Sequence, residues 1–81
     1  MHIGERIAQI LHEKEITVVS FAQQLCYTRA NIYKILSKKS IDTDLLLRIS
    51  AILEHDFFSE YQHELSKKAT KQKTLTEFAS K

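Results

Sequence analysis

The chain has 81 residues, of which 43% are hydrophobic and 27% charged, ordinary proportions for one soluble globular domain. A single domain of this size is too small for a catalytic cleft between two lobes. Proline is absent and Gly4 is the only glycine, so the chain lacks the turn residues that several β-hairpins would need. The composition therefore predicts an all-α fold and argues against a β-sandwich or β-barrel.

Membrane insertion and disulfide bonding are not expected. No apolar run approaches the roughly 18 residues that a membrane-spanning helix needs. The first residues include Glu5 and Arg6 instead of the basic and apolar segments of a leader peptide. Cys26 is the only cysteine, so it can form neither an internal disulfide nor a zinc site by itself. We therefore expect a cytoplasmic protein, and its small core favours a dimer.

The formal charge of +2 hides four blocks of alternating sign. Residues 1–25 carry −1, residues 26–41 carry +4 with no acidic residue, residues 42–64 carry −5 and residues 65–81 carry +4. A basic segment beside an acidic one would turn toward a polyanion, and nucleic acid is the first candidate. From charge alone, a solvated surface is an equally good interpretation of the same segment.

Hydrophobic periodicity predicts five helices, over residues 2–14, 18–25, 28–36, 43–53 and 57–65. Four of these helices follow a residue that can cap the helix N-terminus, namely Thr17, Thr28, either Asp42 or Thr43, and Asp56. Few apolar residues remain after the last helix. We therefore expect a domain over residues 1–65 and a basic tail over residues 66–81, either frayed or ordered by a partner.

The second and third predicted helices form a candidate helix-turn-helix. About three residues separate them, and the small Ala22 stands where the two helices would come closest. Leu25, Ile32 and Ile35 would fill the space beneath. The outward residues of the helix over 28–36 belong to the basic block, so geometry and charge together favour nucleic acid.

Three strings follow one another between residues 2 and 55, HIGERIAQIL, SFAQQLCYTRANIYKIL and LLLRISAIL. Their notable features are Ile3 with Gly4, Phe21 with Ala22, Ile32, and the pattern from Leu46 to Leu53. With these features the chain resembles the Cro/repressor family of bacterial and phage helix-turn-helix regulators. The resemblance implies a five-helix, lambda-repressor-like DNA-binding domain whose function is transcription regulation, more often as a repressor.

The chain departs from the family pattern at three places. Cys26 stands where the family usually has the turn glycine, and a left-handed backbone there would cost about 1 kcal/mol. Leu36 and Lys38 replace the Glu and Gly that often close the third helix in relatives. Val18 replaces a glutamine that often holds a phosphate, so phosphate contacts are not expected near Val18.

The resemblance further implies that the helix over 28–36 enters the major groove of double-stranded DNA. Arg29 suits two hydrogen bonds to a guanine, Ala30 suits a thymine methyl group, and Lys34 suits a guanine or a phosphate. Tyr33 either stacks on DNA, bonds a phosphate, or packs along its neighbours. The full set of expected DNA-binding residues is Thr28, Arg29, Ala30, Asn31, Tyr33 and Lys34 in the helix, and Lys38, Lys39 and Ser40 in the loop after it. The loop residues suit contacts to the DNA backbone.

Phe57, Phe58 and Tyr61 are the candidate dimer contacts. A short core can hide one or two of these rings, and the remaining aromatic surface favours an interface, although core filling alone explains the cluster equally well. A two-fold homodimer would bind a palindromic operator with its recognition helices about 34 Å apart. The lysines between Lys67 and Lys73 either attract DNA without sequence preference or form a soluble tail.

Catalytic and cofactor chemistry are not expected. The sequence has no nucleophile beside a base, no paired carboxylates in a cleft and no glycine-rich phosphate loop, and its histidines lack metal-ligand spacing. We expect no metal, cofactor or small-molecule effector, and we interpret Cys26 as a partly buried residue that fills the turn, without a redox role. The alternative function is a protein-interaction module, such as an antitoxin or phage-type regulatory partner, and the departures at Val18, Leu36 and Lys38 motivate it.

Overall fold

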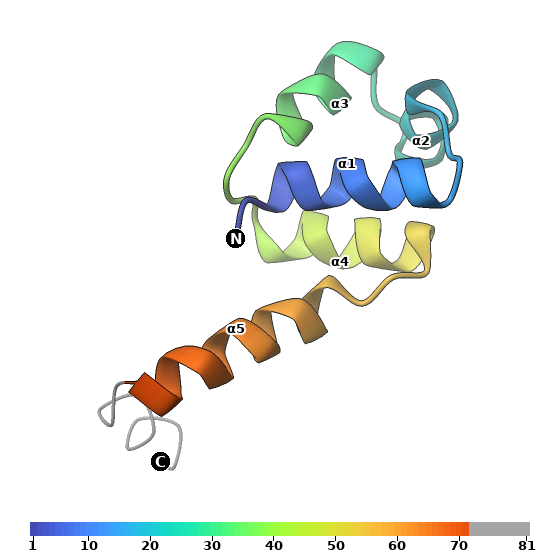
Figure 1. The fold of residues 1–81 in the computed structure, drawn as a ribbon. Helices are drawn as coiled ribbons and strands as arrows, with labels where there is room; N and C mark the ends of the chain where they lie inside the picture. The colour runs from blue at the N-terminus through green and yellow to red at the C-terminus, as the bar shows by residue number, and fades with distance from the viewer. Residues whose placement is uncertain (72–81) are drawn as a thin grey trace.

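The computed structural model of the protein describes residues 1–71 as five α-helices (Figure 1). The helices are α1 (Ile3–Glu13), α2 (Val18–Leu25), α3 (Arg29–Leu36), α4 (Thr43–Leu53) and α5 (Phe57–Lys71). In Figure 1, α1 to α4 form a compact group and α5 extends away from them as a rod. The all-α prediction is confirmed. None of the helices within residues 1–71 has the length and apolar composition needed to cross a bilayer.

Polar side chains begin four of the helices at the positions that the sequence predicts. Each cap accepts a hydrogen bond of 2.8–3.2 Å from the backbone amide three residues later, at Thr17, Thr28, Asp42 and Asp56. Asp42, not Thr43, is therefore the cap of α4. The cap of α1 was not predicted: Nδ1 of His2 accepts a hydrogen bond of 3.1 Å from the amide of Glu5.

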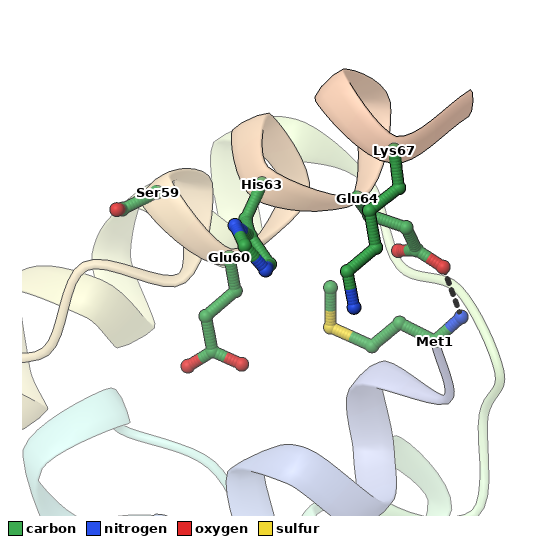
Figure 2. Close-up of a pocket in the computed structure, with 6 residues that line it drawn as sticks. All are labelled: Met1, Ser59, Glu60, His63, Glu64 and Lys67. Atoms are coloured by element: carbon green, nitrogen blue, oxygen red, sulfur yellow. Dashed lines mark hydrogen bonds and ion pairs between the residues drawn. The ribbon is translucent and has the colours of Figure 1, made fainter. Parts of the chain in front are cut away.

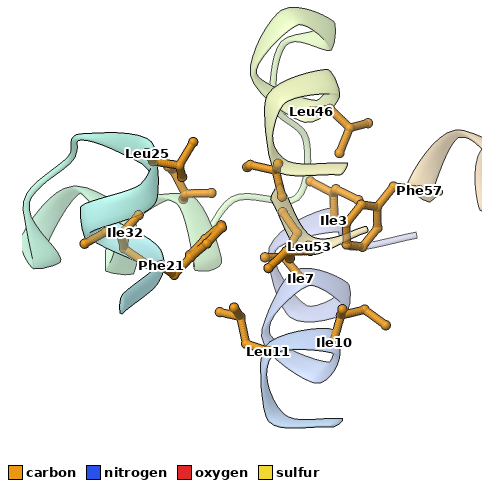
Figure 3. Packing of buried hydrophobic residues seen from close by; sticks show 13 residues of the cluster. Ile3, Ile7, Ile10, Leu11, Phe21, Leu25, Ile32, Leu46, Leu53 and Phe57 are labelled. Atoms are coloured by element: carbon orange, nitrogen blue, oxygen red, sulfur yellow. The ribbon is translucent and has the colours of Figure 1, made fainter. Parts of the chain in front are cut away.

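One hydrophobic core receives side chains from all five helices (Figure 3). Its buried members are Ile3, Ile7, Ile10, Leu11, Phe21, Ala22, Leu25, Ile32, Ile35, Leu46, Ile49, Leu53 and Phe57. Burial of a side chain as large as leucine or isoleucine contributes about 1.5–3 kcal/mol. Phe57, at the base of α5, is 0% exposed and anchors this helix to the group formed by α1 to α4.

Helix α5 continues past its predicted end at Leu65 to Lys71. The prediction relied on the loss of apolar residues, but a helix can also be supported by charged pairs three and four residues apart. Glu64 interacts electrostatically with Lys67 and Lys68 in this way. The predicted boundary between domain and tail therefore falls inside a helix, and residues 72–81 of the predicted tail lie outside the described residues.

Gly4 allows the start of α1 to touch the end of α3. A Cβ atom at position 4 would lie 2.2 Å from the carbonyl oxygen of Leu36, which is too close for any side chain. The amides of Ile3 and Gly4 donate hydrogen bonds of 3.0 Å to the carbonyl oxygens of Lys39 and Lys38. These bonds satisfy amides in the first turn of α1 and hold the loop after α3 in place.

Replacing Gly4 with alanine should destabilise the protein. We expect Gly4→Ala to lower the free energy of unfolding by about 1–3 kcal/mol, because the backbone of Leu36 must move to admit a methyl group. Helix propensity acts in the opposite direction, since alanine is favoured over glycine by about 1 kcal/mol. Urea unfolding followed by circular dichroism measures the difference, with exposed His12→Ala as the control in the same helix. A Gly4→Ala variant as stable as the parent would contradict the close contact.

The carboxylate of Glu60 also ties α5 to the rest of the protein. It accepts a hydrogen bond of 2.6 Å from Nε of Arg6 in α1 and forms a second, short one with Nε2 of His55. Partial burial of Glu60 favours its neutral form, but the hydrogen bonds from Arg6 and His55 outweigh burial. The pKa of Glu60 is therefore lower than its ordinary value of 4.5.

This lowered pKa makes the contribution of Glu60 to stability dependent on pH. The contribution is fully present above pH 4.5 and is lost as the pH falls through the lower pKa of the folded protein. We expect Glu60→Gln to be less stable than the parent by about 1 kcal/mol at neutral pH, and the two proteins to converge in acid. The urea midpoints of both proteins, measured from neutral pH into acid, test this expectation. Glu15→Gln is the control for the loss of one negative charge. A difference in stability between Glu60→Gln and the parent that persists in acid would contradict the role of the ionised Glu60 carboxylate.

Candidate nucleic-acid interface

The turn between α2 and α3 has the left-handed geometry that the family usually assigns to glycine. Cys26 has φ 60° and ψ 38°. Its side chain is exposed, so the prediction that it is partly buried was wrong. Its amide donates to the carbonyl of Gln23 over 3.1 Å, and the amide of Tyr27 donates to the carbonyl of Ala22 over 2.9 Å. Backbone hydrogen bonds therefore close the turn around a non-glycine residue, at a cost of about 1 kcal/mol.

Helix α3 buries one side and exposes the other. Ile32 is 0% exposed and Ile35 is 4% exposed, so these two side chains hold α3 against the core. Tyr33 is 60% exposed, which shows that it is not packed away among its neighbours. All six residues predicted to bind DNA from this helix are exposed, namely Thr28, Arg29, Ala30, Asn31, Tyr33 and Lys34.

The loop after α3 presents the rest of the predicted set. Lys38, Lys39 and Ser40 are exposed, and the carbonyls of the two lysines are the ones bonded to the start of α1. The backbone of the loop is thus held while its side chains remain in solvent. We call the cations of this region, Arg29, Lys34, Lys38 and Lys39, the basic face.

The cations of the basic face have no acidic partner among the residues that the structure describes. Within the described part of the chain, none of the four forms an ion pair. The other two arginines of the protein do have partners. Arg6 binds Glu60, and Arg48 donates to the carbonyl of Leu25. Arg29 alone among the three arginines has no hydrogen-bond partner inside the described chain, so its guanidinium is available to a ligand.

A groove of about 270 Å³ runs beside the basic face, between α3 and the start of α4. Its lining includes Asn31, Lys34 and Lys38 on the α3 side and Asp42 at the start of α4. Tyr27 also lines it, and sequence reasoning did not include this residue in the site. In the sequence, the feature that could have pointed to Tyr27 is its position directly before Thr28, the cap of α3. The groove therefore has a basic side and an acidic edge, which favours an anion on the α3 side.

A hollow of about 470 Å³ lies elsewhere, between the first residue of the chain and α5 (Figure 2). Its lining residues are Met1, Ser59, Glu60, His63, Glu64 and Lys67. The amino group of Met1 donates to Glu64 over 2.9 Å, and the surrounding charges are of both signs. None of these residues belongs to α3 or to the basic face, so this hollow is separate from the candidate DNA-binding surface.

The predicted dimer contacts divide between core and surface. Phe57 is 0% exposed and leaves no surface for a partner, so its assignment to an interface is corrected to a core role. Phe58 is 37% exposed and Tyr61 is half-buried. Neighbouring hollows connect Leu47 to Phe58, Phe58 to Tyr61, and Tyr61 to Leu65. We call this continuous surface of α4 and α5, formed by Leu47, Phe58, Tyr61 and Leu65, the apolar strip.

Comparison with known proteins agrees with this arrangement. A family model described as a Cro/C1-type HTH DNA-binding domain matches residues 6–57. The match contains α2, α3 and α4 in full, together with the turn, the loop and the basic face. Searches of curated proteins and of solved structures gave no match. With five helices within residues 1–71 and this match over most of its length, the chain belongs to the family of Cro/C1-type helix-turn-helix DNA-binding domains.

Proposed function

We propose that the protein is a sequence-specific regulator of transcription that binds double-stranded DNA in the cytoplasm. The observation that carries this proposal is the basic face, whose four cations have no acidic partner within residues 1–71 while the opposite side of α3 is buried in the core. A helix exposed in this way fits the major groove. Occupancy of an operator excludes other proteins from the same groove, so we further propose that the protein acts as a repressor.

The residues of the basic face have different roles in this proposal. Arg29 lies in the first turn of α3, close to where base edges would lie, and its fork of donors matches the two acceptors of a guanine. Lys34 contacts a guanine or a phosphate from the next turn. Lys38 and Lys39, with Ser40, bind phosphates from the loop, whose backbone is fixed to α1.

Substitutions at two cations should separate base contacts from phosphate contacts. We expect Arg29→Ala to cost about 1–3 kcal/mol on the selected duplex and to relax base preference there. Lys39→Ala should weaken binding to all sequences alike and reduce the slope of log affinity against log salt by about one. Fluorescence anisotropy over a salt series, with duplexes selected from a random pool, measures both. Equal losses for Arg29→Ala on selected and random DNA would refute its base contact.

The apolar strip supports a homodimer. Phe58, Tyr61 and Leu65 recur on α5 at the spacing of one helical face; Phe58 and Leu65 are exposed, and Tyr61 is partly packed against the core. The start of α5 is acidic and its second half is basic, with the cap Asp56 followed by Glu60 and Glu64 and then by Lys67 and Lys68. Two antiparallel copies of α5 place opposite charges together, whereas parallel copies place like charges together. We propose a two-fold dimer through antiparallel α5 helices and a palindromic operator.

A charge placed in the apolar strip should disrupt this dimer. Leu65 is 46% exposed, so Leu65→Asp should leave the fold intact while burying an unpaired carboxylate in the interface. Analytical ultracentrifugation should show a dimer for the parent and a monomer for the variant. Val19→Asp is the control, because Val19 is 45% exposed but lies on α2, away from the strip. A monomeric parent at all concentrations would contradict the proposal.

A second candidate function is a protein-interaction module, such as an antitoxin or a phage-type regulatory partner. The apolar strip favours it, since an exposed surface of this kind also fits a different protein. The departures from the family pattern at Val18, Leu36 and Lys38 point the same way. Selection of bound duplexes from a random pool at low salt separates the two functions. Enrichment of a palindrome supports the regulator, and no binding supports the module.

A further inference from the structure

Arg48 of α4 contacts both sides of the turn that precedes α3. Its Nη2 atom donates a hydrogen bond of 3.1 Å to the carbonyl oxygen of Leu25, the last residue of α2. Its guanidinium carbon lies 5.8 Å from the centre of the Tyr27 ring, within range of a cation–π interaction. Leu25 and Tyr27 are the two neighbours of Cys26. One guanidinium from another helix therefore spans the turn.

The contact lies beside one of the three non-glycine residues of the described chain that have a positive φ, the other two being Glu15 and Glu54. Cys26 is held at φ 60°, a conformation that glycine adopts freely and other residues resist. The carbonyls at the end of α2 also lack partners within their own helix, and a cation is favoured at this negative end. Arg48 supplies both a donor for Leu25 and a positive charge at the end of α2.

The geometry of the turn determines where α3 points. Tyr27 is followed directly by Thr28, whose hydroxyl caps α3, and Arg29 is the first residue of the helix. Beside Tyr27, the groove of about 270 Å³ separates much of α3 from the start of α4. The contact between Arg48 and Tyr27 is thus a direct link between α4 and the start of α3, at the end that carries Arg29.

We propose that Arg48 is a positioning residue for DNA binding. It holds the turn in its left-handed geometry where the family usually relies on glycine, and it thereby fixes the direction in which α3 presents Arg29. The proposal rests on the proposed function, because its effect is on the base contacts of α3. Arg48 itself contributes no contact to DNA, which distinguishes it from the lysines of the basic face.

The test combines a substitution at Arg48 with one at the turn. We expect Arg48→Met, which keeps the long side chain without its charge, to weaken binding to the selected duplex about tenfold. This factor corresponds to one base contact that is lost because Arg29 is misplaced. The salt slope should stay unchanged. Adding Cys26→Gly should restore most of the affinity, because glycine adopts the left-handed conformation without strain.

A second measurement follows the turn without DNA. Amide hydrogen exchange at Asn31, whose amide is bonded to the cap Thr28, should become faster in Arg48→Met and slower again in the double variant. Arg6→Met is the matched control, since Arg6 binds Glu60 in a different part of the protein. It should alter neither the exchange at Asn31 nor the response to Cys26→Gly.

Two results would overturn the proposal. A salt slope reduced by about one in Arg48→Met would show that Arg48 binds a phosphate instead. Unchanged affinity in the folded variant, with unchanged exchange at Asn31, would show that the turn does not depend on Arg48. If the parent protein binds no duplex at all, the proposed function fails, and the exchange measurement still decides whether Arg48 holds the turn.

Discussion

The position of α3 depends on contacts made at its two ends. A helix of eight residues is too short to be stable in water alone, so its neighbours must hold it. At its C-terminal end, the backbone of Leu36 lies against Gly4, and the loop that follows is hydrogen-bonded to α1. At its N-terminal end, the turn at Cys26 and the cap Thr28 fix its first residues. With Ile32 and Ile35 in the core and Leu36 packed against it, the side chains of α3 from Arg29 to Asn31 and those of Tyr33 and Lys34 face solvent.

The features that sequence predicted well are those that depend on neighbouring residues. The inward faces of the helices follow from their spacing, and the caps from Thr17 to Asp56 follow from side chains that bond an amide three residues later. The left-handed turn was anticipated from the family pattern. The exposure of the predicted DNA-binding residues follows from the same periodicity, because the apolar positions of α3 determine which side chains remain outside.

The features that sequence missed depend on residues far apart in the chain. Arg48 and Leu25 are separated by 23 positions, and Arg6 and Glu60 by 54, so no local pattern brings them together. Phe57 and Phe58 are adjacent aromatic residues, and only the packed core decides that the first is buried and the second exposed. The end of α5 was placed too early because charged residues, rather than buried ones, support its last turns.

The continuity of Phe57 with both the core and α5 has a mechanical consequence. A helix of 15 residues spans about 22 Å at 1.5 Å per residue, and α5 is attached to the rest of the protein first by the buried Phe57 and then by Glu60 with Arg6 and Glu64 with the amino group of Met1. A tilt of about 10° about Phe57 would displace the far end by about 4 Å over this length, and the ion pairs of Glu60 and Glu64 would have to adjust to it. In the proposed dimer, substitutions around Phe57 would therefore change the separation between the two subunits without altering either basic face, and the proposed operators with different half-site spacing could be matched by repacking around this ring.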